Sequence, residues 1–367
     1  MNEATHIPDE HLFEHASRLK GKVVLITGAA NGIGKETATQ IASYGGKVII
    51  ADRDFPAAEK TVQEIRNAGG TAFALKCDVT VWDDVVAMYE FAIDNFGVVD
   101  VVIPNAGVGE IERFDVKLDS NNKPKQLAYK TIQVNLIGAL NTVQLAQHYL
   151  LKNYQDGDLK GVVVLGSIAS WLPIPGAPQY AASKHAMLGV MRALHPLYTQ
   201  YGIRISSIHP FFANTDIVPL PAKIGMVGIP FTPVPRIAGA IIYAITHPDP
   251  ATSGCAYMLL DDGPVFKIPK EEFKLGIYKL VDERSNALVK YFLLVSCDNW
   301  ASSDLTLQSC GSDGLVATSG WEDYQNNLVI GCNLCGLVMV PGRKEVLAMN
   351  LDPMLLVQYL LSKFEPT

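Results

Sequence analysis

The stretch "VVLITGAANGIGKE", residues Val23–Glu36, decides the fold class of this chain. It opens with a run of apolar, β-branched residues, as in a strand covered on both faces, and it ends with the start of a helical pattern. Gly28, Gly32 and Gly34 stand between the two parts. Glycine allows a tight turn and a close approach of backbone N–H groups to a pyrophosphate, at the positive end of the following helix. This order of strand, glycine turn and helix predicts a nucleotide site.

Six further apolar runs follow the first one at spacings that mostly leave room for a helix. They end at Ala51, Lys76, Ile103, Gly166, His209 and Leu260. Strands and helices in alternation predict an α/β fold, a single Rossmann-type doubly wound sheet of about seven parallel strands. Ligands of such a sheet bind at the carboxyl ends of the strands, where the strand order reverses.

The alternation of strands and helices divides the chain into three parts. Residues 1–20 are expected to form an N-terminal arm, residues 21–290 the nucleotide-binding domain, and residues 291–367 an irregular C-terminal extension. Within the domain, Pro196 is expected to kink or end the helix that starts near Pro178.

Composition excludes several classes of partner. Hydrophobic residues make up 49% of the chain and charged ones 18%, which predicts a well-filled core. The net charge of −7, without a basic run, argues against nucleic acid. The polar start is unlike a signal peptide, and the apolar stretches are too short to predict a membrane span. Unevenly placed cysteines favour a reducing compartment, and so a cytoplasmic location.

Four of the six cysteines lie in the extension. Cys332 and Cys335 form a C-x-x-C pair, with Cys297 and Cys310 upstream. Four thiols can bind zinc, but the upstream pair lacks the close spacing of a zinc ribbon, so no metal site is predicted. A redox pair, a partner-binding module and an appendage produced by gene prediction are the other interpretations of this segment.

The second strand run ends in "IIADRD", which adds a second nucleotide signal. Asp52 lies 24 positions after Gly28, where a carboxylate accepts hydrogen bonds from the adenosine ribose and repels a 2′-phosphate. This favours NAD, with NADP as the alternative because Arg53 follows directly. The structural alternative for Asp52 is a turn-forming residue at a strand end.

The segment "PQYAASKHAM" places Tyr180 and Lys184 one helical turn apart. A free phenol has a pKa of about 10, and a neighbouring ammonium or the positive ring of an oxidised nicotinamide favours its ionised form. Such a phenol can exchange a proton with an alcohol during hydride transfer. The alternative is a surface pair, a packed ring beside a lysine that extends to solvent.

These motifs stand in a characteristic order: "TGAANGIG", "CDVT", "NAG", an asparagine, a serine and "YAASK". From about Gly21 to Leu288 the chain therefore resembles the short-chain dehydrogenase/reductase family, most of all fungal-type members of secondary metabolism. The resemblance implies an NAD(P)-dependent oxidoreductase that assembles as a homodimer or homotetramer. A catalytically silent nucleotide-binding regulator with the same fold is the alternative function.

The resemblance also implies roles for individual residues. The catalytic residues would be Asn135, Ser167, Tyr180 and Lys184, with Tyr180 as acid/base, Ser167 on the substrate oxygen, Lys184 on the cofactor ribose and Asn135 holding a water. The cofactor-binding residues would be Gly28, Asn31, Gly32, Ile33, Gly34, Asp52, Asp78, Val79, Asn105 and Thr215, together with Tyr180 and Lys184.

One departure from the family pattern concerns the substrate pocket. The family has Pro-Gly after the sixth strand, whereas this chain has Phe211 in place of the glycine. A side chain there disfavours positive φ, so the backbone is expected to differ and Trp171, Phe211 and Phe212 to border the substrate. Apolar residues dominate the neighbouring segments, Leu220 and Met226 among them, which predicts a hydrophobic alcohol or ketone as substrate.

Overall fold

The computed structural model of the chain describes residues 5–274 apart from 153, 156, 216, 219–222, 224–226 and 262, and three short strands further on. The chain divides into two compact units, Met1–Leu288 and Val289–Thr367. In the second unit, β12 (Ile330–Cys332), β13 (Leu337–Met339) and β14 (Val346–Ala348) form an antiparallel sheet. The cysteine side chains of the extension lie outside the described residues, and so does every expectation placed on them.

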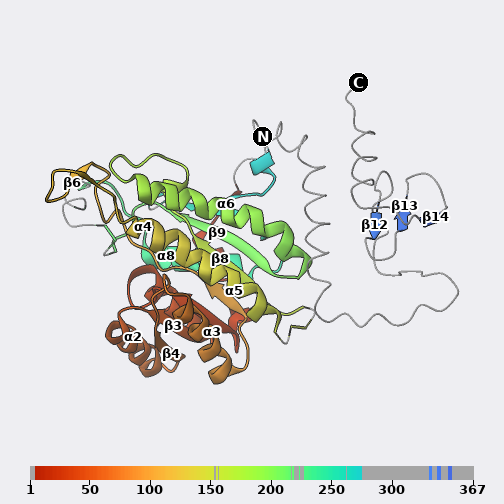
Figure 1. Cartoon of the computed structure of the whole chain (residues 1–367). Coiled ribbons are helices and arrows are strands. Elements are labelled where there is room, and N and C mark those ends of the chain that lie inside the picture. Colours follow the sequence, from red (N-terminus) through yellow and green to blue (C-terminus); the bar gives the residue numbers. More distant parts are fainter. Residues whose placement is uncertain are drawn as a thin grey trace. The chain divides into compact units, whose positions relative to one another are not determined.

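The first unit is built on a nine-stranded sheet in the order β1-β11-β10-β9-β8-β5-β2-β3-β4 (Figure 1). Seven neighbouring strands are parallel, and they are the seven predicted from the sequence. They are β2 (Val23–Thr27), β3 (Lys47–Asp52), β4 (Thr71–Lys76), β5 (Val101–Ile103), β8 (Gly161–Leu165), β9 (Arg204–Pro210) and β10 (Ala256–Leu259).

Helices cover both faces of this sheet (Figure 1). They are α1 (Gly32–Ser43), α2 (Phe55–Asn67), α3 (Trp82–Phe96), α4 (Lys130–Ile132), α5 (Ala139–Leu151), α6 (Pro178–Gln200) and α8 (Val234–Thr246). A π-helical turn, Gln133–Gly138, joins α4 to α5. A small hairpin of β6 (Lys117–Leu118) and β7 (Pro124–Lys125) projects at one end of the domain.

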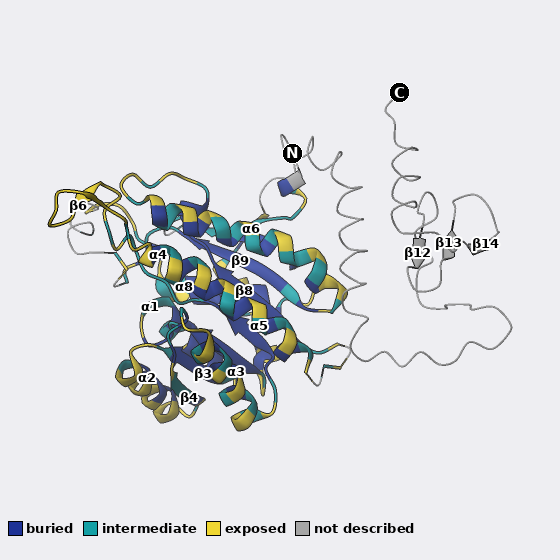
Figure 2. Ribbon diagram, in the orientation of Figure 1, coloured by how far each residue is buried: buried dark blue, intermediate teal, exposed yellow. Residues whose placement is uncertain are grey.

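The parallel strands contribute to two separate cores. Val24 and Ile26 pack with residues of α1, α2 and α8, whereas Leu25 packs with residues of α3, α5 and α6. Side chains alternate across a strand, so a strand buried on both faces is expected to be largely apolar. Figure 2 shows these strands as a buried layer between helices that expose only their outer faces.

Two edge strands and the arm complete the domain in a way that the sequence did not predict. β11 (Val265–Ile268) pairs antiparallel with β10, and β1 (Thr5–Ile7) with β11. After β1 in the chain come Leu12, Ala16 and Leu19, which are buried in the core beside α8. The described part of the arm therefore belongs to the hydrophobic core of the first unit.

Helix α6 does not end at Pro196 but continues to Gln200. Tyr198, in its last turn, is 1% exposed, and its hydroxyl donates to the Val143 carbonyl at 3.1 Å. Packing against α5 holds the turn that follows the proline. Among the described residues no helix is long and apolar enough to cross a membrane.

The strand order reverses between β2 and β5, because the chain moves outward through β3 and β4 before it returns to β5 on the other side of β2. The carboxyl ends of β2, β3, β5, β8 and β9 then meet at one edge of the sheet. This edge is where a doubly wound sheet binds its ligands.

Candidate active site

The glycine turn after β2 lines a cavity of about 1070 Å³ at this edge of the sheet. Gly28 and Gly32 have φ angles of 66° and 57°, which side chains disfavour. Gly34 allows close packing instead, since a Cβ there would lie 2.4 Å from the Gly28 carbonyl oxygen and 2.5 Å from Nδ2 of Asn105. With Asn31 and Ile33, the turn and the start of α1 form one wall of the cavity.

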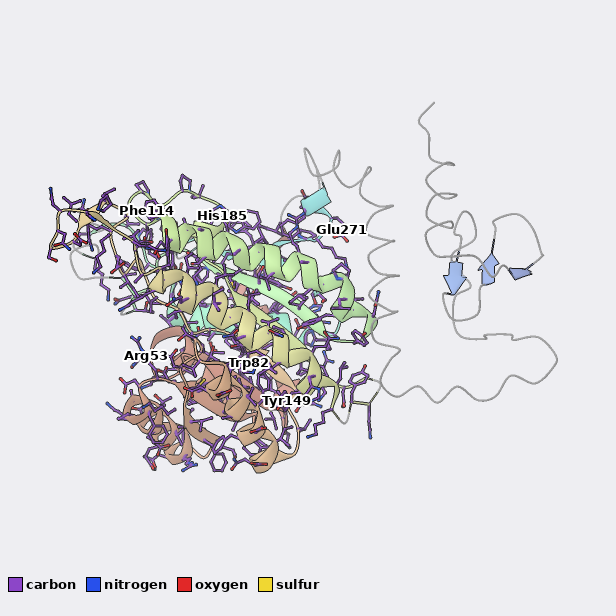
Figure 3. All side chains as sticks on the ribbon, viewed as in Figure 1. Arg53, Trp82, Phe114, Tyr149, His185 and Glu271 are labelled. Carbon is purple, nitrogen blue, oxygen red and sulfur yellow. The ribbon has the colours of Figure 1, made fainter. Side chains whose placement is uncertain are left out.

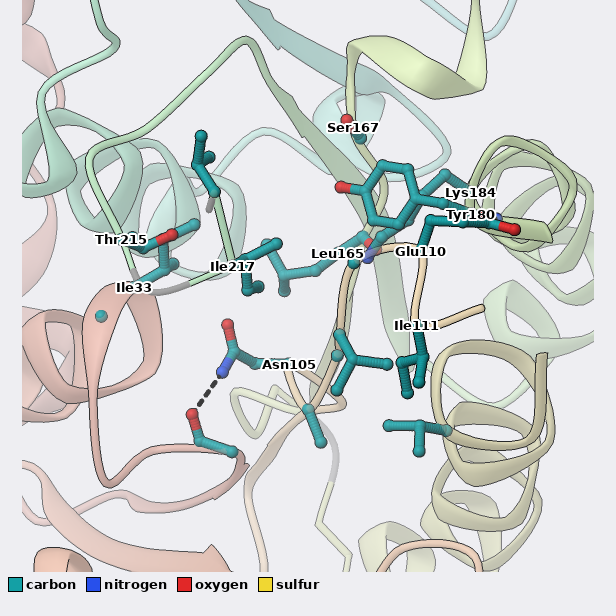
Figure 4. A pocket seen from close by; sticks show the side chains of 18 of the residues that line it. Ile33, Asn105, Glu110, Ile111, Leu165, Ser167, Tyr180, Lys184, Thr215 and Ile217 are labelled. Carbon is teal, nitrogen blue, oxygen red and sulfur yellow. Dashed lines mark hydrogen bonds between the residues drawn. The ribbon is translucent and has the colours of Figure 1, made fainter. Parts of the chain in front are cut away.

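Asn105 ties the glycine turn to the strand beside it. Its Nδ2 donates to the carbonyl oxygens of Thr27 at 2.9 Å and of Gly28 at 2.8 Å. Ala106 then approaches Gly28 so closely that a Cβ on the glycine would lie 2.6 Å from its Cα. The loops after β2 and β5 are therefore held together beneath the cavity (Figure 4).

Asp52 also lines the cavity, at the end of β3. Oδ2 of its carboxylate accepts a hydrogen bond from the Ala30 amide and Oδ1 accepts one from the Asp54 amide, both at 3.0 Å. Asp52 thus stabilises the turn at its own strand end and the glycine turn beside it. Each carboxylate oxygen keeps capacity for another donor from the cavity. Arg53 lines the same region.

The loop after β4 forms a further part of the lining, with Cys77, Asp78 and Val79. Oδ1 of Asp78 accepts from the amide and the hydroxyl of Thr80, and the Val79 carbonyl accepts from Nδ2 of Asn141 at 3.1 Å. Burial, with nearby carboxylates, raises the pKa of the Cys77 thiol to about 12, so this thiol stays neutral.

Ser167, Tyr180 and Lys184 meet on the opposite wall (Figure 4). Ser167 follows β8, while the other two come from consecutive turns of α6. Oγ of Ser167 accepts from the Ala169 amide at 3.1 Å. The Nζ of Lys184 donates to the Leu165 carbonyl at 2.9 Å and lies 5.8 Å from the centroid of the Tyr180 ring. His185, the next residue, lies on the exposed face of the helix (Figure 3).

Sequence reasoning missed a residue that joins these two elements. The hydroxyl of Ser170 donates to the Lys184 carbonyl at 2.6 Å and accepts from the Ser167 amide at 3.2 Å. It is 3% exposed. Only the fold places this serine beside α6, so no local pattern could have identified it.

The electrostatics of the site correct one expectation. Burial raises the pKa of the Tyr180 phenol, and the Ser167 side chain offsets this only in part. The Lys184 ammonium is itself buried, which lowers its pKa to about 8. In the protein alone, the net shift of the Tyr180 pKa is therefore upward, because desolvation dominates.

Asn135 lies in the π-helical turn and is 2% exposed. Its Oδ1 accepts from the Val108 amide at 2.8 Å, while its Nδ2 donates to the Val108 carbonyl at 2.9 Å and to the Ser183 hydroxyl at 3.1 Å. Its amide thus fastens the loop after β5 to the helices. A π-helical turn within an α-helix is frequent at functional sites.

A second residue that sequence reasoning missed is Glu110, in the loop after β5. Its side chain lines the cavity and reaches the start of α6, where its carboxylate accepts from the Tyr180 amide at 2.8 Å (Figure 4). It lies three positions after the "NAG" segment, but nothing in the sequence shows that this loop faces α6.

The remaining wall of the cavity is apolar. Phe211 and Phe212 line it, with their ring centroids 4.9 Å apart, and the φ of Phe211 is not positive. Ile217 approaches Gly109 on the opposite side, where a Cβ would lie 3.2 Å from the Ile217 carbonyl oxygen. Also in the lining are Val108, Ile111, Leu165, Ile168, Ile174 and Val218.

The other expected residues of this region have different positions. Thr215 lines the cavity beside Gly32. Trp171 does not line the cavity, although it was expected to border the substrate. Its ring is stacked on Phe273 and edge-on to the buried His209. Leu220 and Met226 lie outside the described residues.

Comparisons with known proteins agree with this arrangement. Residues 22–221 match the family model of the short chain dehydrogenases. The chain is 31% identical over 252 residues to a cyclohexanol dehydrogenase of Acinetobacter sp. (strain SE19), covering 67% of this chain and 91% of that protein. It is 31% identical over 286 residues to a short-chain dehydrogenase/reductase of Acremonium egyptiacum, covering 76% of this chain and 85% of that protein.

A solved structure extends the likeness to the fold. It is a 3-ketoacyl-(acyl-carrier-protein) reductase of Brucella melitensis complexed with NADH, with a TM-score of 0.56 and 26% identity over 69% of this chain and 99% of that one. The family match, the order of the strands and the glycine turn agree. The chain therefore belongs to the short-chain dehydrogenase/reductase family.

Proposed function

We propose that this protein is an NAD-dependent oxidoreductase that interconverts a hydrophobic secondary alcohol and its ketone. The observation that carries the proposal is that Ser167, Tyr180 and Lys184 line the same cavity as the glycine turn. Family membership and the likeness to a cyclohexanol dehydrogenase support oxidoreduction of alcohols and ketones in general.

The residues of the cavity fit a nicotinamide dinucleotide. The space beside Gly28 and Gly32, at the start of α1, suits a pyrophosphate. The Asp52 carboxylate has free acceptor capacity for ribose hydroxyls and would repel a 2′-phosphate, which favours NAD, while Arg53 keeps NADP as the alternative. When bound, the nicotinamide supplies or accepts the hydride.

Tyr180 would exchange the proton of the substrate oxygen. Its raised pKa keeps the phenol neutral near pH 7, the state needed to donate a proton to a ketone being reduced. Ser167, which lines the same wall of the cavity, would stabilise the charge that develops on the substrate oxygen. For oxidation the phenol must lose its proton, and the Lys184 charge, mostly present at pH 7, would assist.

The substrate class follows from the apolar wall of the cavity. Phe211, Phe212, Ile217 and Ile174 offer apolar contacts, while the charged residues of the lining lie elsewhere, as Glu110 does at the start of α6. An apolar ketone or alcohol of ring or chain type would lose its hydration shell here at low cost. A sugar would lack hydrogen-bond partners along this wall.

The test follows NADH absorbance with a panel of apolar ketones and alcohols. We expect turnover by the protein, and loss of at least about 100-fold in kcat for Tyr180→Phe, because a general acid contributes that much. Fluorescence would measure the binding of NADH and, for comparison, of NADPH. NADH binding should be retained in the variant. Binding of NADH without turnover of any compound would favour a silent nucleotide-binding regulator, and unchanged turnover by Tyr180→Phe would refute the assigned role.

We further propose a cytoplasmic location, because the unevenly placed cysteines favour a reducing compartment. We also propose assembly as a homodimer or homotetramer, as the family resemblance implies. Ile137 and Leu140 are 44% and 39% exposed on the helix that carries Asn135, which suits a contact between copies. Light scattering of the purified full chain would determine the number of subunits.

A further inference from the structure

We propose that Glu110 is a positioning residue, which holds the start of α6 and thereby sets the place of Tyr180 in the cavity. This inference rests on the proposed function for its catalytic consequence, but the contact itself belongs to the fold. Glu110 stands in the loop after β5, 70 residues before Tyr180 in the chain.

The start of α6 depends on an acceptor from elsewhere. Ala177 occupies the position before the first helical residue and has no side-chain acceptor, and Pro178 opens the helix. The amides of Gln179 and Tyr180 therefore need partners outside the helix. Oε2 of Glu110 accepts from the Tyr180 amide at 2.8 Å, and Oε1 lies 3.4 Å from the Gln179 amide. A carboxylate here also interacts favourably with the positive end of a 23-residue helix.

The backbone around Glu110 is fastened on both sides. Val108 exchanges two hydrogen bonds with the Asn135 amide. The Thr131 hydroxyl donates to the Gly109 carbonyl at 3.0 Å and accepts from the Ile111 amide at 3.1 Å. Glu110 therefore reaches α6 from a rigid support rather than from a free loop.

This contact connects the two halves of the site. The loop of Glu110 begins at Asn105, which ties down the glycine turn, while α6 carries the phenol. Without the carboxylate, the first turn of α6 would lose its outside partner, and Tyr180 lies in that turn. A displacement of about 1 Å at a reacting group can lower a rate about 100-fold.

The experiment compares Glu110→Ala and Glu110→Gln with a matched control, Asp249→Ala. Glutamine keeps an oxygen that can accept from the Tyr180 amide. Asp249 likewise accepts a helix-start amide, that of Ala251 at 2.8 Å, but on the exposed side of the short helix Pro250–Thr252, away from the cavity lining. Loss of the carboxylate that accepts a helix-start amide, at Glu110 or at Asp249, should lower the melting temperature by a few degrees.

Steady-state kinetics provides the first readout. We expect Glu110→Ala to lower kcat about ten-fold or more, with the NADH dissociation constant within about two-fold, because cofactor contacts remain. Glu110→Gln should restore kcat to within about three-fold of the unaltered protein, because an amide oxygen is also an effective cap. Asp249→Ala should leave kcat unchanged. Equal kcat in Glu110→Ala and Asp249→Ala would overturn the proposal.

Hydrogen exchange of the cofactor-free protein provides a readout that needs no substrate. The peptide spanning residues 177–187 should exchange about ten-fold faster in Glu110→Ala than in the unaltered protein or in Asp249→Ala. If no alcohol or ketone is turned over, the proposed function fails while this comparison still decides the contact. Unchanged exchange in Glu110→Ala would overturn the positioning role, whatever the activity.

Discussion

Replacing Lys184 by methionine should stabilise the protein while abolishing its activity. Lys184 is 7% exposed, and burial lowers its pKa from 10.5 to about 8. At neutral pH the folded chain therefore keeps an ammonium in a place that disfavours its charge. Methionine has a similar length, is apolar and removes that charge.

The size of the effect follows from the two pKa values. The difference between 10.5 and about 8 corresponds to roughly 3 kcal/mol of lost stability. The folded state binds fewer protons than the unfolded chain between these values, so the penalty is full below about pH 8 and is relieved as the pH rises toward 10.5. Against this, the variant leaves the Leu165 carbonyl without its donor, which costs about 1–2 kcal/mol. The net gain near pH 7 should be about 1–2 kcal/mol.

Urea unfolding of the cofactor-free protein measures this balance. Far-UV circular dichroism of the full chain and of Lys184→Met at about pH 7 gives the difference in unfolding free energy. The same pair at about pH 9.5 should show almost no difference, because most of the lysine penalty is then relieved. Turnover at about pH 7 should be lost, because the ammonium beside Tyr180 is then missing.

The pH dependence decides between explanations. A gain in stability that stays constant between the two pH values would mean that methionine packs better, not that a buried charge is removed. A variant less stable than the unaltered protein near pH 7 would contradict the reasoning, because it would mean that the Leu165 hydrogen bond outweighs the cost of burying the charge.

Two further substitutions test the packing that builds the site. Gly34→Ala should lower NADH affinity at least about ten-fold, because its Cβ would lie 2.4 Å from the Gly28 carbonyl oxygen and must displace the glycine turn; unchanged binding by fluorescence would show that the turn adjusts freely. Leu12→Ala should reduce the unfolding free energy by about 2–4 kcal/mol, because this leucine is 2% exposed within the core; a loss under about 0.5 kcal/mol in urea unfolding would indicate an arm that does not pack in solution.

Short-range pattern determined most of the architecture. Most of the seven parallel strands are apolar runs, because a strand between two layers of helices has no polar face. In β9, Ser206, Ser207 and His209 are buried as well. Gly28, Gly32 and Gly34 mark the turn locally, because their backbone angles or close contacts exclude side chains. Tyr180 and Lys184 share one helix, so their spacing alone places them on one side of it.

Contacts between distant segments were decided only by the tertiary structure. Leu12 and Leu19 belong to no strand or long helix, and their burial depends on α8, more than 200 residues later. Trp171 lies close in sequence to Ser167, yet its ring packs on Phe273 behind the cavity. Glu110 and Ser170 reach α6 across 70 and 14 residues.

The raised pKa of Tyr180 also belongs to the tertiary structure, because desolvation is set by everything packed around a group rather than by its neighbour in the helix. Local sequence thus determined which residues form the elements and which of them carry the chemistry. The fold alone determined how those residues are supported and charged, because support and desolvation come from segments that are distant in the chain.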